Sequence, residues 1–207
     1  MTRLGFLIAR ALGQEDRLQA LSCPAAQVEA QLRGTSVALV GNARRPGPAG
    51  QGAMIEAADL VIRLNRAPMP AEDSHGQRTD ILALATAISA ADLARIQPGR
   101  ILWMSHKRKR LPWTVAQSPG FHLPGLAAFH RLQTALGAPP STGLMLIDLL
   151  ARSEAREISL YGFDFFTSLS LSGRRAATQV PHDFAAERDF VEALIARDPR
   201  FRLIAAT

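Results

Sequence analysis

Short apolar runs alternate along the chain with segments of helical periodicity. The runs are rich in valine, isoleucine and leucine, which is typical of strands that are buried on both faces of a sheet. They lie at residues 36–40, 60–64, 81–84, 100–104 and 157–161. This alternation of strands and helices predicts an α/β fold with a mostly parallel sheet that helices cover on both faces.

The segments between the runs have the apolar spacing of helices. Helices are predicted at residues 85–96, 126–136, 143–152 and 184–197, the last of which would close the chain. A further amphipathic element is expected over residues 14–31, where leucine and valine recur at roughly helical intervals. The segments 112–124 and 169–180 are predicted to be surface loops that form a lid or the rim of an acceptor site.

The composition limits the class of protein. A chain of 207 residues suits one domain. Hydrophobic residues make up 47% and charged residues 20%, which excludes general disorder, and the apolar runs are too short to cross a bilayer. The sequence has one cysteine, Cys23, and its first residues lack the pattern of an export signal. We therefore expect a cytoplasmic protein without an internal disulfide.

The chain is basic, with a net charge of +6 and a pI of about 10.8, so its field attracts polyanions. The densest basic run, residues 106–110, lies between Trp103 and Trp113. Two interpretations are open: the run binds phosphates while the tryptophans stack on a sugar or base, or it is a solvated loop. No other feature is typical of nucleic-acid binding, so nucleic acid is not expected as a partner.

The first of three candidate segments follows the strand predicted at residues 36–40. Gly41 and Asn42 come directly after it, at a carboxyl end where open α/β sheets bind ligands. The glycines beyond them depart from the dinucleotide-binding spacing, so an NAD site is not expected. Arg63 and Asn65 are predicted to project from one side of the next strand segment. Asn42 and Asn65 either bind a ligand or form hydrogen bonds with the backbone of turns, and the sequence favours neither interpretation over the other.

The second and third segments combine a helix start with a candidate base. Ser141 and Thr142 precede an apolar helical run, where a hydroxyl caps the helix or the exposed amides bind an anion. His182 stands just before the last predicted helix, with Glu187 about one turn along it. Histidine suits general-base catalysis because its ordinary pKa lies near neutrality, although a histidine at a helix start is more often structural. No segment of the sequence has the spacing of a metal site.

In their order and pairing, these segments resemble the sialyltransferase family, glycosyltransferase family 29. VALVGN at residues 37–42, followed by glycines, VIRLNRAP and GQRTD, is similar to the large sialyl motif. PSTG at residues 140–143, running on to LYGF at residues 160–163, is similar to the small sialyl motif. HDFAAE at residues 182–187 matches the very small motif.

The resemblance implies a short, bacterial-type member with a GT-A-like Rossmann variant fold. It implies inverting, metal-independent transfer of sialic acid, a related nonulosonic acid or Kdo from a CMP-activated donor to a glycan hydroxyl. His182 would be the general base and Glu187 a second catalytic residue. The implied nucleotide- and donor-binding set is Gly41, Asn42, Arg63, Asn65, Ser141, Thr142, Gly143, Tyr161 and Gly162.

The partners implied are a CMP-sugar and a glycan or lipid-linked glycan acceptor, with no cofactor. The basic surface also suggests peripheral contact with an anionic inner membrane. The expected division of the single domain is an N-terminal helical extension (1–34), a nucleotide-binding part (35–84), a variable acceptor region (85–139) and a small-motif and catalytic part (140–207).

The sequence departs from animal members of the family in two respects. Val37 and Ala155 stand near the positions of a cysteine pair that joins the large and small motifs, so packing must replace that disulfide. No histidine lies between residues 163 and 181, where those members carry one, so Arg174 and Arg175 are expected to stabilise the leaving phosphate.

Two alternatives of other classes are retained. If the missing histidine motif signals lost turnover, the chain is a CMP-binding, non-catalytic module of a glycan assembly system. A nucleic-acid-binding protein that uses residues 106–110 is ranked last. The identities of the donor sugar, the acceptor and the linkage do not follow from the residues.

Overall fold

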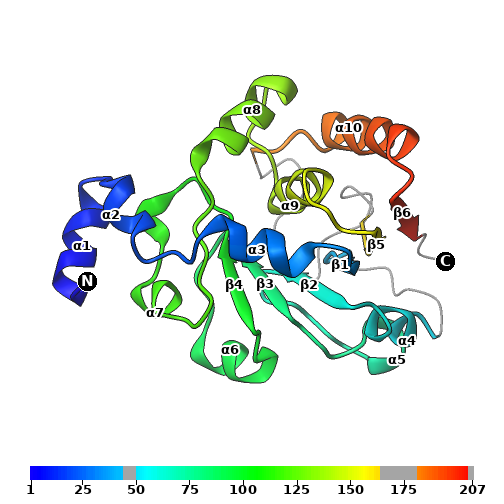
Figure 1. Ribbon diagram of the computed structural model, residues 1–207, viewed down its shortest axis with the longest axis horizontal. Helices are drawn as coiled ribbons and strands as arrows, with labels where there is room; N and C mark the ends of the chain where they lie inside the picture. The colour runs from blue at the N-terminus through cyan, green and yellow to red at the C-terminus, as the bar shows by residue number, and fades with distance from the viewer. Residues whose placement is uncertain (44–49, 164–180, 205–207) are drawn as a thin grey trace.

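A computed structural model describes residues 1–43, 50–163 and 181–204. In this part of the chain, six parallel strands form one sheet in the order β4-β3-β2-β1-β5-β6 (Figure 1). The strands are β1 (Ser36–Val40), β2 (Leu60–Leu64), β3 (Ile81–Leu84), β4 (Arg100–Trp103), β5 (Glu157–Tyr161) and β6 (Phe201–Ile204). The predicted parallel α/β architecture is confirmed.

Five of these strands coincide with the predicted apolar runs, because strands buried on both faces need apolar side chains at nearly every position. The sixth, β6, was not predicted. It lies at an edge of the sheet, and two of its four residues, Arg202 and Leu203, are exposed. The helix at residues 184–197 therefore does not close the chain.

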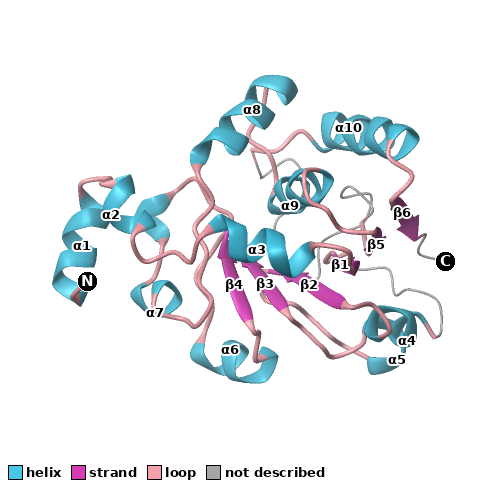
Figure 2. Cartoon of the chain, viewed as in Figure 1, coloured by secondary structure: helices cyan, strands magenta, loops and turns pink. Residues whose placement is uncertain are grey.

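Helices surround the sheet (Figure 2). The described residues form α1 (Arg3–Ala11), α2 (Glu15–Gln19), α3 (Ala25–Leu32), α4 (Gln51–Glu56), α5 (Glu72–His75), α6 (Ala90–Ile96), the 3-10 helix η1 (Arg108–Arg110), α7 (Trp113–Ala116), α8 (Leu126–Leu136), α9 (Thr142–Ala151) and α10 (Phe184–Arg197). The bounds of α8 and α10 match the prediction, and α9 begins one residue earlier than predicted. Helix α6 begins only at Ala90, because Ser89 caps it by accepting a hydrogen bond from the Asp92 amide.

Two predictions about local structure were wrong. The element expected over residues 14–31 is two helices, α2 and α3, because Pro24 has no amide hydrogen to continue a helix from the preceding turn and stands at the start of α3. The segment 112–124 is not simply a surface loop. It contains α7, and Phe121 and Leu123 are buried beside the edge strand β4, where His122 forms a parallel bridge with Leu102.

The two faces of the sheet have separate cores, as expected for helices on both sides. Leu39, Ile62 and Ala83 pack with α3, α8, α9 and α10, whereas Val61 packs with α4 and Leu82 with α1, α2, α6 and α7. Val37 and Ala155 are both buried in the first of these cores, which supplies packing where animal sialyltransferases are expected to have a disulfide. None of the described helices is long and apolar enough to span a bilayer.

Candidate functional site

The carboxyl ends of β1, β2 and β5 meet at one edge of the sheet, since these strands are parallel neighbours. Gly41 and Asn42 follow β1, Asn65 follows β2, and Gly162 follows β5. The fold thus brings residues of the first and second predicted segments together at the edge where open α/β sheets bind ligands.

Gly41 and Gly162 are in close backbone contact. The Gly41 amide donates to the Tyr161 carbonyl at 2.7 Å, and the Ala43 amide donates to the Gly162 carbonyl at 3.2 Å. A Cβ atom on Gly41 would lie 2.4 Å from the Gly162 oxygen. Gly162 itself has a φ of 64°, which favours glycine. The approach of the strand ends therefore requires glycine at position 41, whereas glycine at position 162 is favoured by its backbone conformation.

The ring of Phe163 links the large-motif and small-motif segments. A Cβ atom on Gly41 would lie 3.2 Å from this ring, and one on Gly143 would lie 2.9 Å from it. Gly143 is in the first turn of α9, so the ring packs between the end of β1 and the start of this helix. Phe163 was not in the predicted site, because a phenylalanine after an apolar strand has no feature in the sequence that separates it from ordinary core.

Both predicted asparagines bind backbone at the strand ends. Asn42 donates from Nδ2 to the Leu64 carbonyl at 3.3 Å, which joins the end of β1 to the end of β2. Asn65 has a φ of 52°, and its Oδ1 accepts a hydrogen bond from the Ala85 amide at 3.0 Å. These contacts agree with the interpretation that the asparagines form hydrogen bonds with the backbone of turns. They also hold the ends of the strands in place at this edge of the sheet.

Arg63 and Tyr161 are part of the scaffold beneath this edge. Arg63 is 1% exposed, and it donates from Nε to the Arg78 carbonyl at 2.9 Å and from Nη2 to the His75 carbonyl at 2.7 Å. Burial lowers the pKa of Arg63 to about 10, so it remains charged at neutral pH. Its Nη1 has no hydrogen-bond partner in the described part of the chain.

Tyr161 is 3% exposed and packs against Ile55, and burial raises the pKa of its phenol. Neither side chain opens to solvent.

Ser141 and Glu187 join the second and third segments. The carboxylate of Glu187 accepts hydrogen bonds from the Ser141 amide at 2.6 Å and the Ser141 hydroxyl at 2.7 Å. The same hydroxyl accepts a hydrogen bond from the Leu144 amide at 3.2 Å, so Ser141 caps α9. Thr142, half-buried, begins that helix, and Gly143 follows it. The sequence separation of 46 residues hides this pairing.

Glu187 is 3% exposed, and its surroundings shift the pKa of its carboxyl group in opposite directions. Burial, the largest influence, raises the pKa of the carboxyl group, while the hydrogen bonds from Ser141 and the nearby His182 oppose that shift. The net direction is upward. A buried carboxylate with both oxygens engaged is suited to holding Ser141 in place.

His182 is half-buried, and a backbone carbonyl orients its ring. Its Nδ1 lies 2.8 Å from the Pro139 carbonyl oxygen. A carbonyl can only accept, so Nδ1 carries a proton, and Nε2 is the nitrogen left to act as an acceptor when the ring is neutral. The carboxylate of Asp183 does not perform this orientation, because it caps α10 by accepting from the Ala186 amide at 3.0 Å. The ring also packs edge-on against Phe184.

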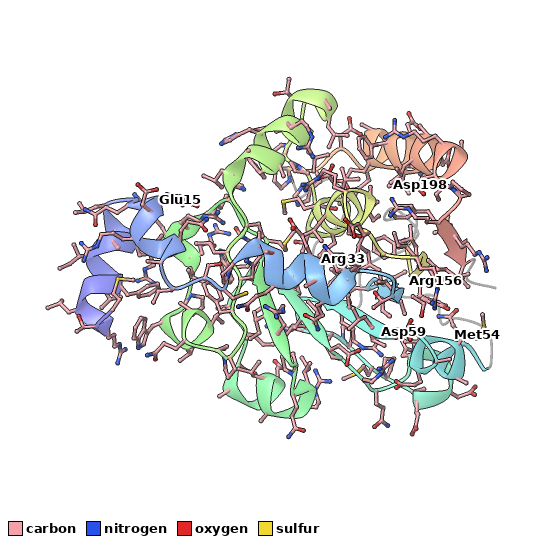
Figure 3. The ribbon with its side chains drawn as sticks, viewed as in Figure 1. Glu15, Arg33, Met54, Asp59, Arg156 and Asp198 are labelled. Atoms are coloured by element: carbon pink, nitrogen blue, oxygen red, sulfur yellow. The ribbon has the colours of Figure 1, made fainter. Side chains whose placement is uncertain are left out.

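Three further sequence predictions concern the arginines at positions 174 and 175, the basic run and a metal site. Arg174 and Arg175, and the predicted loop at 169–180, lie outside the described residues. In the basic run, Arg108 is buried and bonded at 2.8 Å to Glu15, which lies on α2 (Figure 3). Trp103 is fully buried, so that tryptophan offers no stacking surface. Among the described residues, no group of three or more metal-ligating side chains occurs.

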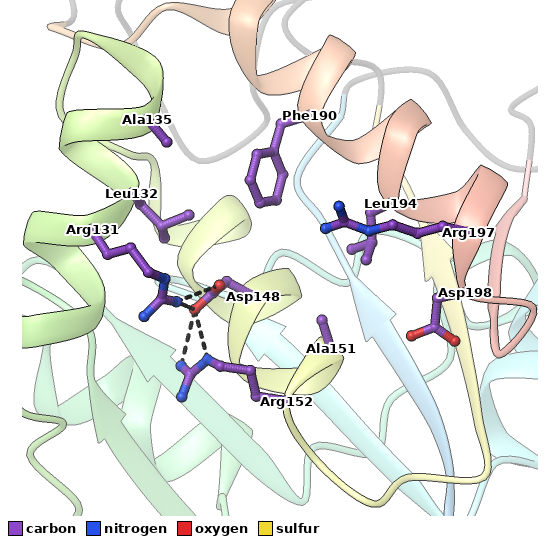
Figure 4. A pocket seen from close by; sticks show the side chains of 10 residues that line it. All are labelled: Arg131, Leu132, Ala135, Asp148, Ala151, Arg152, Phe190, Leu194, Arg197 and Asp198. Atoms are coloured by element: carbon purple, nitrogen blue, oxygen red, sulfur yellow. Dashed lines mark hydrogen bonds and ion pairs between the residues drawn. The ribbon is translucent and has the colours of Figure 1, made fainter.

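A cavity of about 580 Å³ lies between α8, α9 and α10 (Figure 4). Asp148 lies in its wall and accepts hydrogen bonds from Arg131 at 2.6 Å and from Arg152 at 2.9 Å. Along α9, Asp148 is about 10 Å from Ser141 at 1.5 Å per residue. The cavity contains none of the predicted site residues and is separate from the carboxyl edge of the sheet.

The sequence matches no protein-family model and no curated protein. Solved structures are nevertheless similar to this fold. A mammalian sialyltransferase in complex with Gal-beta-1-3GalNAc-ortho-nitrophenol matches with a TM-score of 0.60 and 16% identity, over 86% of this chain and 72% of that chain. A variant of the sialyltransferase CST-II in complex with CMP matches with a TM-score of 0.58 and 12% identity, over 82% of this chain and 81% of that chain. The α/β fold implied by the sialyltransferase resemblance is confirmed.

Proposed function

We propose that this protein is a sialyltransferase of glycosyltransferase family 29. It transfers sialic acid, a related nonulosonic acid or Kdo from a CMP-activated donor to a hydroxyl group of a glycan or lipid-linked glycan. The observation that carries the proposal is the Ser141–Glu187 pair, because it holds the start of α9 beside the segment that bears His182. The three motif segments and the sialyltransferase fold support the same assignment.

In the proposed reaction, the acceptor hydroxyl attacks the anomeric carbon of the donor. Nε2 of His182 takes the hydroxyl proton as the new carbon–oxygen bond forms. The bond between the anomeric carbon and the phosphate oxygen breaks, and CMP leaves with its electron pair. Attack from the face opposite the leaving group inverts the configuration at that carbon. The protonated Nδ1, fixed on the Pro139 carbonyl, supports this role for Nε2.

The donor phosphate is assigned to the start of α9. The first N–H groups of a helix have no intrahelical acceptor, and a helix N-terminus favours an anion. Ser141 supplies one such amide to Glu187, while Thr142 and Gly143 are the next residues along the chain. Asn42, Asn65, Gly41 and Gly162 shape the nucleotide-binding edge, and Arg63 and Tyr161 support it from below in this proposal. Glu187 acts as a positioning residue.

No divalent cation is required in this proposal. A monophosphate leaving group carries less charge than a diphosphate, and no Asp-x-Asp motif occurs in the sequence. Arg174 and Arg175 would stabilise the phosphate that leaves. Unchanged turnover after replacement of both arginines by alanine would remove them from the mechanism.

The test measures CMP release from CMP-Neu5Ac and CMP-Kdo, with a chelator and without added metal, for the wild type and His182→Ala. CMP release from one of the two donors by the wild type, with little or no release by His182→Ala, would support the transferase and identify the sugar that it uses. CMP binding without release from either donor favours the second candidate, a CMP-binding module. The lack of a histidine between residues 163 and 181 is the observation that favours this candidate.

A further inference from the structure

Helix α1 presents an apolar face to solvent. Leu4 and Leu12 are each 68% exposed, and Ile8 is 44% exposed. These residues recur every four positions, so they line one face of the helix together with Met1 and Leu7. Of the seven large hydrophobic side chains that are exposed in the described residues, five belong to this segment. Exposed apolar residues scattered singly are ordinary, but a contiguous group on one helix indicates a surface that another apolar phase covers.

The opposite face of α1 fixes the helix to the body of the protein. Phe6 and Ala9 are fully buried, and the ring of Phe6 packs 5.0 Å from that of Trp113 on α7. Arg10 donates to the Leu111 carbonyl at 2.9 Å, which ties α1 to the segment after η1. The exposed stripe is therefore presented by an anchored helix, at the end of the molecule formed by α1 and α2 (Figure 1).

Positive charge is concentrated around this helix. Residues 1–17 and 107–110 contain seven lysines and arginines and two carboxylates, a net charge of +5, whereas the whole chain carries +6. Lys107, Lys109 and Arg110 are exposed on and beside η1, which packs against α1. Of the two carboxylates, Glu15 is paired with the buried Arg108. The apolar stripe thus has a cationic border.

We propose that α1 is a membrane-surface anchor that inserts its apolar face into a bilayer containing anionic lipid. A helix that lies in the interface buries apolar side chains among the acyl chains while lysine and arginine contact anionic headgroups. Leu4, Ile8 and Leu12 make the apolar contact, and Lys107, Lys109 and Arg110 make the electrostatic contact. The charge border favours this occupant over a second copy of the same chain, whose identical cations would repel. This inference does not depend on the proposed transferase activity.

Co-sedimentation with lipid vesicles tests the anchor without any substrate. The wild type should bind vesicles of phosphatidylcholine and phosphatidylglycerol more tightly than vesicles of phosphatidylcholine alone, and binding should weaken as salt is raised. Leu4→Ser, Ile8→Ser and Leu12→Ser together should reduce binding at least about tenfold, since apolar burial is lost. Lys109→Gln with Arg110→Gln should weaken binding to the anionic vesicles by about fivefold for each cation removed.

The matched control replaces Met54 and Leu203, the other exposed hydrophobic side chains of the described part, by serine. Met54 lies on α4, at the opposite end of the molecule from α1 (Figure 3). This control should bind like the wild type, and all variants should keep the wild-type melting temperature. Failure of the wild type to bind anionic vesicles, or equal binding by the α1 variant, would overturn the proposal. A dimer in solution that the α1 substitutions convert to a monomer, with no vesicle binding, would assign the stripe to a second copy instead.

Discussion

Glu187 binds Ser141 through both carboxylate oxygens, one to the backbone amide at 2.6 Å and one to the hydroxyl at 2.7 Å. This pair connects the first turn of α10 to the cap of α9, two helices that begin at the candidate site. The segment 182–187 therefore has two separate features, since His182 offers an acceptor nitrogen while Glu187 holds the start of α9.

Replacing His182 by asparagine should separate catalysis from structure. An asparagine amide can still donate to the Pro139 carbonyl, but it offers no basic nitrogen to the acceptor. We expect kcat to fall by about 10² to 10⁴, the typical contribution of a general base, with the melting temperature nearly unchanged. Donor-cleavage kinetics and thermal unfolding measure the two effects. Full turnover in His182→Asn would exclude this residue as the base.

Much of the fold could be predicted, and with it the strand ends that carry Gly41, Asn65 and Gly162, because fully buried parallel strands must be apolar throughout. β1, β2, β3 and β5 have the predicted bounds for this reason. Edge strand β6 could not be identified, since half of its residues are exposed. The roles of Phe163 and Pro139 could not be found either, because one acts through ring packing and the other through a backbone carbonyl, which any residue possesses. Residue type alone cannot reveal such contacts.

Replacing Glu187 by alanine should destabilise the protein and impair the site. The change removes both acceptors of Ser141 and leaves the Ser141 amide without this partner, at a cost of about 2–4 kcal/mol. A melting temperature lower by roughly 4–16 °C is expected for a domain of this size. The isosteric Glu187→Gln variant should retain more stability, because its side-chain oxygen still accepts one hydrogen bond. Equal stability of Glu187→Ala and wild type would show that the pair does not hold the helices.

The pH dependence of stability should report the burial of Glu187. Its folded pKa is raised above the ordinary value of 4.5, so the folded protein holds this proton to higher pH than the unfolded chain does. The contribution of Glu187 to the unfolding free energy is therefore complete below pH 4.5 and falls as pH rises through the folded pKa. The unfolding free energy of Glu187→Gln minus that of the wild type should increase from pH 4.5 up to the folded pKa and then level off. A relative stability that decreases with pH would contradict a raised pKa.

Replacing Gly41 by alanine should be far more damaging than replacing Gly125. The new Cβ would lie 2.4 Å from the backbone oxygen of Gly162, so β1 and β5 must separate. We expect a loss of about 3 kcal/mol in unfolding free energy, together with weaker CMP binding. At Gly125 a Cβ atom meets no heavy atom within 4 Å, so its replacement should change stability by less than about 0.5 kcal/mol. Chemical denaturation of both variants makes the comparison.

Replacing Arg63 by methionine should destabilise the edge of the sheet that is proposed to bind nucleotide. The carbonyls of His75 and Arg78 lose a buried donor, and each unsatisfied group costs about 1–3 kcal/mol. The control is Arg33→Met, because Arg33 is largely exposed and its ion pair with Glu154 contributes at most about 1 kcal/mol. Thermal unfolding should separate the variants by several degrees. Comparable melting temperatures would mean that the buried guanidinium is dispensable.

The neighbouring positions of β1 and β5 also determine when the site can form. Strand β1 pairs with β2 on one side, but on its other side Ser36 pairs with Glu157, so that side of the strand gains its partner only from the last third of the chain. Contacts between such distant residues form late, because a long loop must close before they are gained. A nascent chain that ends before β5 would lack Gly162, Phe163 and the whole of α10, so the carboxyl edge of its sheet would be incomplete. Binding of CMP at the proposed site should accordingly appear only after nearly complete synthesis, together with closure of the sheet.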